Sequence, residues 1–239
     1  MRLPLFAFPF FAVVAFASHG GSRAAERVDV IVVLASDVSR SVTDDKFVLQ
    51  RRGYAEALTD KRVLHTIAEG EHGKIALMFI EWAGASDQRV VVEWSLIRTV
   101  EDAVGFAGKL SEAPRSFMGL TAIGSAIEFS ARQIANAPYQ SDRKVIDVSG
   151  DGISNGGLNT RAARDAALNG SVTTINGIVI LTDPTTVPPD MDAHTNPPGG
   201  LASYYRDDVI GGSGSFVTTA EGFEAFGRSL VLKLMREIS

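Results

Sequence analysis

Acidic and hydroxyl side chains follow two segments of the chain that are predicted to be strands, at the points where these segments end. The sequence DVSRS, residues 37–41, comes directly after residues 28–36, and Asp151 follows residues 143–149. The first segment is a nearly continuous apolar, β-branched run, which is typical of a strand buried on both faces of a parallel sheet. If the two strands are neighbours where the strand order reverses, the loops that follow them converge on one crevice. Oxygen ligands suited to a hard divalent cation would then meet there.

The DVSRS segment matches the DxSxS motif of the von Willebrand factor type A domain, which opens the metal-ion-dependent adhesion site of that family. Residues 119–121 (GLT) resemble the family's threonine loop, and residues 149–152 (SGDG) resemble its later aspartate turn. The resemblance extends over residues 28–238 with the motifs in the right order, and three separated motifs are more specific than any one alone. Residues 145–152 (VIDVSGDG) and 204–212 (YYRDDVIGG) also resemble a bacterial secreted family of unknown function with this fold. Arg40 departs from the glycine usual between the two serines, which affects the loop geometry.

The resemblance implies that one divalent cation, Mg²⁺ or else Mn²⁺ or Ca²⁺, binds at five residues: Asp37, Ser39, Ser41, Thr121 and Asp151. The three hydroxyls would bind the cation directly, and the two carboxylates would act mainly through bound waters. Hydroxyls and waters satisfy such a cation without cancelling its charge, so the remaining position could take an acidic side chain of a protein partner. On this interpretation the chain is a cation-dependent binding module and not an enzyme. The alternative is structural: the two serines only cap the next helix, and Asp151 only turns the chain.

Two enzyme classes compete with the binding module. Residues 152–156 (GISNG) fit the GxSxG pattern of a serine hydrolase with Ser154 as nucleophile, and Asp192 and His194 follow in the order of the α/β-hydrolases. Further glycines prolong the loop where that family begins a helix, which argues against it. The second rival is a magnesium-dependent phosphatase of the haloacid dehalogenase type, because Asp37 ends a strand and GDGISN resembles the late acidic motif of that family. Its second aspartate is missing, and the hydroxyl of Ser39 cannot serve as a general acid at neutral pH.

The elements that would position these residues alternate between strands and helices, which predicts a doubly wound α/β fold: a mostly parallel sheet with one antiparallel edge strand and helices on both faces. The hydrophobic patterns predict strands over 28–36, 73–82, 88–94, 143–149, 172–181 and 215–218. They predict helices from residue 43 through 58 and over 99–110, 121–136, 160–168 and 223–238. A short connection between 73–82 and 88–94 is typical of a hairpin, so one edge strand should be antiparallel.

Two further features bear on the site. Residues 181–212 hold five of the nine prolines, so we expect a long loop there, leaving the carboxyl end of a parallel strand on the face where such sheets bind ligands. Asp147 lies inside an otherwise apolar strand, on the same face as Ser149 and Asp151. It either orients residues of the site or is a core acid that needs a partner, and we expect the structural role.

Composition limits the classes of protein that remain. The chain has no cysteine, which excludes disulfides and thiolate sites, and its net charge of −5 without a basic cluster disfavours nucleic acid as a partner. Arg2, the uncharged run 3–17 and the small residues around Ala17 predict a signal peptide over 1–24, cleaved after Ala17 or Ala24. The predicted organisation is therefore a signal peptide followed by one domain over 25–239, periplasmic or secreted, with no stable membrane insertion after cleavage.

Overall fold

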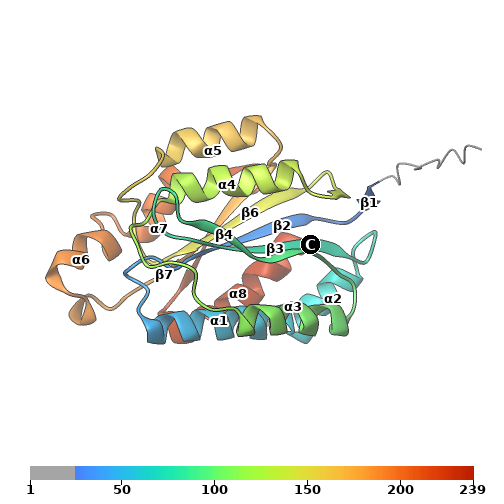
Figure 1. Cartoon of the computed structure of the whole chain (residues 1–239), viewed down its shortest axis with the longest axis horizontal. Helices are drawn as coiled ribbons and strands as arrows, with labels where there is room; N and C mark the ends of the chain where they lie inside the picture. Colours follow the sequence, from blue (N-terminus) through green and yellow to red (C-terminus); the bar gives the residue numbers. More distant parts are fainter. Residues whose placement is uncertain (1–24) are drawn as a thin grey trace, which may run out of the picture.

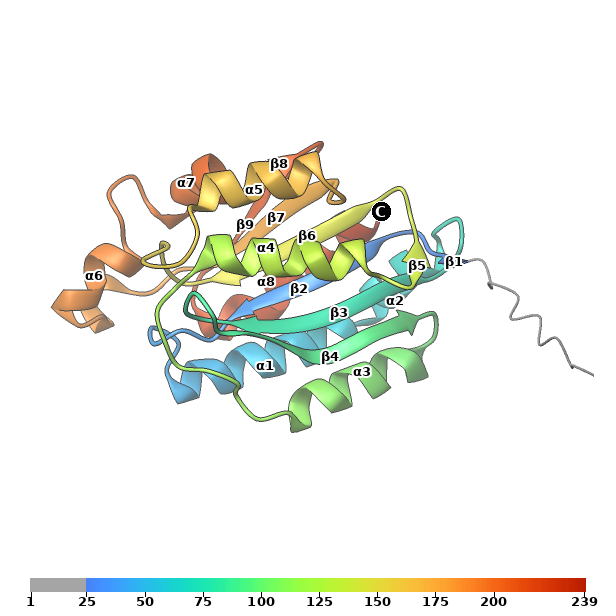
Figure 2. The same cartoon turned by 45° about the horizontal axis from the view of Figure 1, so that its top comes forward.

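The computed structural model describes residues 25–239, apart from the side chain of Asp190, and is built around a seven-stranded sheet. The strand order is β4-β3-β2-β6-β7-β8, and β9 also pairs with β7 (Figures 1 and 2). The strands are β2 (Ile31–Asp37), β3 (Ile75–Trp82), β4 (Gln88–Ile97), β6 (Lys144–Gly150), β7 (Thr174–Ile180), β8 (Gly211–Gly212) and β9 (Val217–Ala220). A separate parallel pair joins β1 (Glu26–Arg27) to β5 (Tyr139–Gln140).

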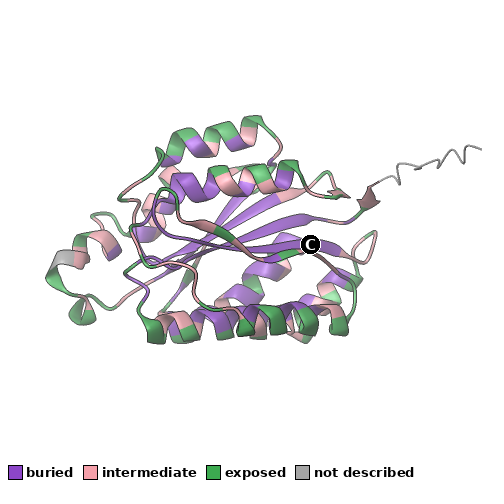
Figure 3. Ribbon diagram, viewed as in Figure 1, coloured by how far each residue is buried: buried purple, intermediate pink, exposed green. Residues whose placement is uncertain are grey.

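The central strands are buried on both faces, as their apolar sequences predict. Along β2, Val32 and Leu34 join one hydrophobic cluster, whereas Ile31, Val33 and Ala35 join the cluster on the opposite face. Figure 3 shows the central strands buried between helices whose outer surfaces are exposed, whereas the edge strand β4 is only partly buried.

Helices cover both faces of the sheet. One face carries α1 (Asp44–Leu58), α2 (Lys61–Ala68), α3 (Val100–Glu112) and α8 (Phe223–Ile238), and the other carries α4 (Ile123–Ala135), α5 (Thr160–Asn169) and α7 (Leu201–Tyr204) (Figure 1). A further helix, α6 (Pro189–Thr195), lies beyond the carboxyl ends of the parallel strands (Figures 1 and 2). Among residues 25–239, no helix combines the length and apolar character that crossing a membrane requires.

The strand order reverses at β2, which pairs in parallel with β3 on one side and with β6 on the other. The chain runs from β2 through α1 and α2 to β3, and later returns to place β6 on the opposite side. Ser36 of β2 lies opposite Ser149 of β6, so the residues that follow both strands emerge side by side. The expected topological switch point is confirmed.

Most predicted elements are confirmed, including the antiparallel edge strand β4 and its hairpin with β3. The patterns did not predict α2 or the short antiparallel pairing of β8 with β7. Residues 181–212, expected to be a long loop, contain α6, α7, β8, a 3₁₀ helix (Pro184–Thr186) and a π-helix (Tyr205–Val209). Pro184 and Pro189 are the first residues of their helices, where the missing proline N–H costs no hydrogen bond. The predicted signal peptide and both cleavage positions lie outside the described residues.

Asp147 belongs to a fully buried polar cluster between β6 and α8. Lys233 Nζ lies 2.6 Å from Asp147 Oδ1 and also forms an ion pair with Glu237. Asn176 Nδ2 donates to Glu237 Oε1 at 2.7 Å. The expected structural role of Asp147 is therefore confirmed, and its partner is a lysine 86 positions away in the sequence.

Candidate metal site

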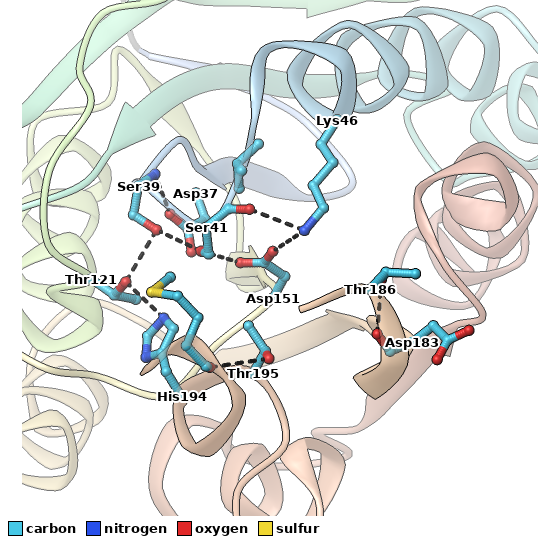
Figure 4. Close-up of polar contacts among 12 residues, drawn as sticks. Asp37, Ser39, Ser41, Lys46, Thr121, Asp151, Asp183, Thr186, His194 and Thr195 are labelled. Carbon is cyan, nitrogen blue, oxygen red and sulfur yellow. Dashed lines mark hydrogen bonds and ion pairs between the residues drawn. The ribbon is translucent and has the colours of Figure 1, made fainter. Parts of the chain in front are cut away.

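Three hydroxyl groups from two loops meet at the carboxyl edge of the sheet, beside the switch point (Figure 4). Ser39 Oγ lies 3.2 Å from Ser41 Oγ, and Thr121 Oγ1 donates to Ser39 Oγ at 3.1 Å. All three side chains are buried. The two serines follow β2, and Thr121 precedes α4, so the three oxygens are brought together by the ends of two elements far apart in the sequence.

Two fully buried carboxyl groups flank the hydroxyls. Asp37 Oδ1 accepts a hydrogen bond from Ser39 N at 2.7 Å, whereas Asp37 Oδ2 has no hydrogen-bond partner among the described residues. Ser41 Oγ donates to Asp151 Oδ1 at 2.5 Å. Burial, reinforced by the nearby charge of Asp151, raises the pKa of Asp37 to about 8. Asp37 can therefore carry its charge near neutral pH only at a cost, which a cation bound nearby would reduce.

The spacing of the hydroxyl oxygens fits octahedral coordination. Six oxygen ligands at about 2.1 Å from Mg²⁺ place neighbouring ligand atoms about 3.0 Å apart. The 3.2 and 3.1 Å separations among Ser39, Ser41 and Thr121 agree with that edge length. Residues 25–239 contain no cluster of three or more His, Cys, Asp or Glu side chains able to hold a metal, so a cation here would depend on the hydroxyls as well as on the two acids.

Arg115 holds the DVSRS loop in shape. Its guanidinium Nη2 donates to the main-chain carbonyls of Val38, Ser39 and Val42 at 2.7, 2.9 and 2.7 Å. The amide of Arg40 donates to Gly119 O at 2.9 Å, which ties the same loop to the threonine loop. The sequence around Arg115 did not predict this role, because the carbonyls that Arg115 contacts belong to residues 73 to 77 positions away in the sequence.

Thr121 is held by the loop that follows Asp151. Asn155 N donates to Thr121 O, and Thr121 N donates to Asn155 Oδ1, both at 2.8 Å. Sequence reasoning missed Asn155, although it lies within the GDGISN segment that drew attention to the site.

The serine hydrolase alternative lacks its hydrogen-bonded triad. Ser154 Oγ donates to the carbonyl oxygens of Thr121 and Gly156, and the described residues show no hydrogen bond from it to a histidine. Asp192 accepts a hydrogen bond from Asn196 Nδ2 at 3.0 Å. His194 instead lies at the hydroxyl cluster, with Nε2 3.2 Å from Thr121 Oγ1. Burial lowers its pKa below the usual range, which favours the neutral ring.

A second group missed from the sequence is Lys46, on the first turn of α1. Its Nζ donates to Ser41 O at 3.0 Å and lies 3.3 Å from Asp151 Oδ2 (Figure 4). Lys46 and Arg40 also line a cavity of about 150 Å³ that borders Ser41. The approach to the hydroxyl cluster is thus positively charged on this side.

Comparison with known proteins places the chain in a family. The family model described as "Protein of unknown function (DUF1194)" matches residues 27–239. The chain belongs to this family. No curated protein matches the sequence.

Solved structures similar to this family member have the von Willebrand factor type A fold. Proximal thread matrix protein 1 from the mussel byssus, with a zinc-occupied MIDAS motif, matches with a TM-score of 0.58 and 15% identity over 89% of this chain and 48% of that one. A von Willebrand factor type A protein from Catenulispora acidiphila matches with a TM-score of 0.54 and 14% identity over 90% and 43%. The open conformation of the pilus adhesin SpaC from Lactobacillus rhamnosus GG matches with a TM-score of 0.56 and 14% identity over 90% and 30%. The chain spans less than half the length of these proteins, and the likeness establishes the fold.

Proposed function

We propose that this protein is a binding module whose activity depends on one divalent cation, held by Asp37, Ser39, Ser41, Thr121 and Asp151. The observation that carries the proposal is the buried set of three adjacent hydroxyls, linked through Ser39 Oγ, between two buried carboxyl groups. The serine and threonine oxygens would be direct ligands, and the carboxylates would act mainly through waters, which suits Mg²⁺, Mn²⁺ or Ca²⁺. A similar fold holding zinc at its MIDAS motif in the mussel protein supports divalent-cation binding.

The partner we propose is a protein that offers a carboxylate to the remaining coordination position. Neutral hydroxyl ligands leave much of the cation's charge available to an incoming anion. Arg40 and Lys46, which line the cavity beside Ser41, would favour an acidic group at short range. The whole chain is acidic, with a net charge of −5, so this local attraction must outweigh weak long-range repulsion.

The cation site is tested by thermal denaturation with and without Mg²⁺ or Mn²⁺. A cation that binds only the folded protein adds about 2.7 kcal/mol to the free energy of unfolding at a concentration of 100 times its Kd. Asp37→Ala, Asp151→Ala and Thr121→Ala should each abolish the shift. Ser154→Ala is the matched control, because its hydroxyl bonds only to main-chain carbonyls of neighbouring loops, and it should keep the shift. A full shift in Asp37→Ala would refute the site.

The binding function is tested by capture of partners from envelope extract with Mg²⁺ or with EDTA. The metal-bridged partner should be lost in EDTA and from Thr121→Ala, and its binding should depend only mildly on salt. Shortening 181–212 should change which partner binds, because this segment contributes α6 beside the site. Rapid hydrolysis of chromogenic phosphate or carboxylate esters would favour the phosphatase or the hydrolase instead.

We also propose export to the periplasm or beyond, with residues 1–24 as the signal peptide. The byssus matrix protein and the pilus adhesin with this fold are compatible with an extracellular setting. Intact-mass analysis of the protein from its native host should find a chain that begins after Ala17 or Ala24. Retention of residues 1–17 in a cytoplasmic fraction would contradict export.

A further inference from the structure

One imidazole reaches the hydroxyl cluster from α6, a helix that the site does not otherwise use. His194 Nε2 lies 3.2 Å from Thr121 Oγ1, the same spacing as that between the two serine oxygens (Figure 4). Neighbouring ligands around a cation of this size are about 3.0 Å apart, so the distance from Nε2 to Thr121 Oγ1 is compatible with two neighbouring ligands of one cation.

The backbone around the site is shaped to admit this ring. Gly152 follows Asp151, and a Cβ atom at position 152 would lie 2.1 Å from His194 Nε2. Any side chain there would exclude the imidazole. The carbonyl of His194 accepts a hydrogen bond from Ile153 N at 3.0 Å, and the next residue, Thr195, is 2% exposed. The loop after Asp151 therefore anchors the main chain of α6 as well as leaving space for the ring.

The second ring nitrogen does not explain the position of His194. Nδ1 is buried and has no hydrogen-bond partner among the described residues. A buried, unpartnered ring nitrogen is unfavourable, and a single hydrogen bond to a hydroxyl gives little compensation. The contact that places the ring is thus the one at Nε2, the nitrogen that faces the hydroxyl cluster.

We propose that His194 is a further direct ligand of the cation, an inference that rests on the cation site proposed above. Its Nε2 would occupy the one coordination position that no other residue of this chain fills. This nitrogen ligand would make the site prefer Zn²⁺ to Mg²⁺. Three hydroxyls and two waters held by the carboxylates account for five of the six positions around a cation. The sixth is the position assigned above to a partner's carboxylate. His194 would therefore compete with the partner's carboxylate for this position.

The choice of cation follows from ligand chemistry. A neutral imidazole nitrogen suits zinc and similar transition metals, whereas Mg²⁺ prefers an all-oxygen shell and gives up its waters reluctantly. Within this site the imidazole of His194 is the group that adds to the preference for zinc.

Isothermal titration of the full-length protein with ZnCl₂ and, separately, with MgCl₂ tests the assignment. We expect His194→Ala to weaken zinc binding at least tenfold while magnesium binding stays within about twofold of wild type. His194→Gln keeps a polar group that can reach Thr121 but is a poor zinc ligand, and it should behave like the alanine variant. His65→Ala is the control, since His65 is exposed on α2 and pairs only with Glu69. Circular dichroism checks that each variant is folded.

The outcomes separate this inference from the proposed function. Equal zinc affinity in wild type and His194→Ala, with zinc binding lost in Asp37→Ala, would overturn the role of His194 and leave the cation site standing. If wild-type protein bound neither cation, the cation site itself would be refuted. If His65→Ala lost as much zinc affinity as His194→Ala, the zinc would be bound adventitiously by surface histidines. This result would also overturn the inference.

Discussion

Asp37→Asn should make the cation-free protein more stable, although it removes a residue of the site. Asp37 is fully buried, and its pKa is raised from 3.8 to about 8 by burial and by Asp151. At pH 7 the carboxyl group of Asp37 is ionised in the unfolded chain but mostly protonated in the folded protein. Because pH 7 is about three units above the ordinary pKa of this group, keeping the proton costs free energy. Each unit is worth about 1.4 kcal/mol, so the folded state is disfavoured by about 4 kcal/mol at pH 7 and by about 2 kcal/mol at pH 5.

The sign follows from the direction of the pKa change. A carboxyl group with a raised pKa in the folded state binds a proton more tightly there, so its contribution to stability is fully present below about pH 4 and is lost as the pH rises towards 8. Asparagine cannot ionise, and its oxygen can still accept the hydrogen bond from Ser39 N. The variant should therefore gain most over wild type near neutral pH.

Urea denaturation in EDTA between pH 5 and pH 8 measures the effect. The difference in the free energy of unfolding between Asp37→Asn and wild type should grow with pH, and adding Mg²⁺ should stabilise wild type alone. Asp45→Asn is the control, because this nearby carboxyl group is exposed and lies outside the site. Equal or lower stability of Asp37→Asn at pH 7 would refute the view that the paired acids destabilise the empty site.

Three further predictions concern the scaffold. Lys233→Met should lower the free energy of unfolding by about 3–5 kcal/mol in urea titrations, because it leaves Asp147 and Glu237 buried without their cation. Gly124→Ala should destabilise the protein by about 1–3 kcal/mol, since its Cβ would lie 2.3 Å from a main-chain oxygen of the loop before α5. Gly105→Ala, in α3 with nothing within 4 Å of its Cβ, should instead raise the melting temperature, and a destabilised Gly105→Ala would contradict this account.

The fold could be predicted from the sequence because its signals are local and repeated. Continuous apolar runs identified the buried strands, and the 3.6-residue pattern identified helices such as α8 at its observed bounds. The positions of Asp37 and Asp151 at strand ends were enough to predict that their loops meet, since parallel strands present their carboxyl ends at one edge. Where the pattern was short or rich in proline, as in α2 and 181–212, the prediction failed because packing and helix-starting prolines decide those segments.

The sequence by itself determined that the DVSRS segment and Asp151 gather at the switch point, because both follow strongly patterned strands, and the family resemblance added Thr121. Only the tertiary structure decided what holds and covers them. Arg115 binds the DVSRS loop across more than seventy residues, and His194 reaches Thr121 across 73. Spacing in the chain carries no information about such contacts, because they form only when separate loops are brought to the same edge of the sheet. The same reason explains why His194 looked like a partner of Ser154 in the sequence and lies against Thr121 in the folded protein.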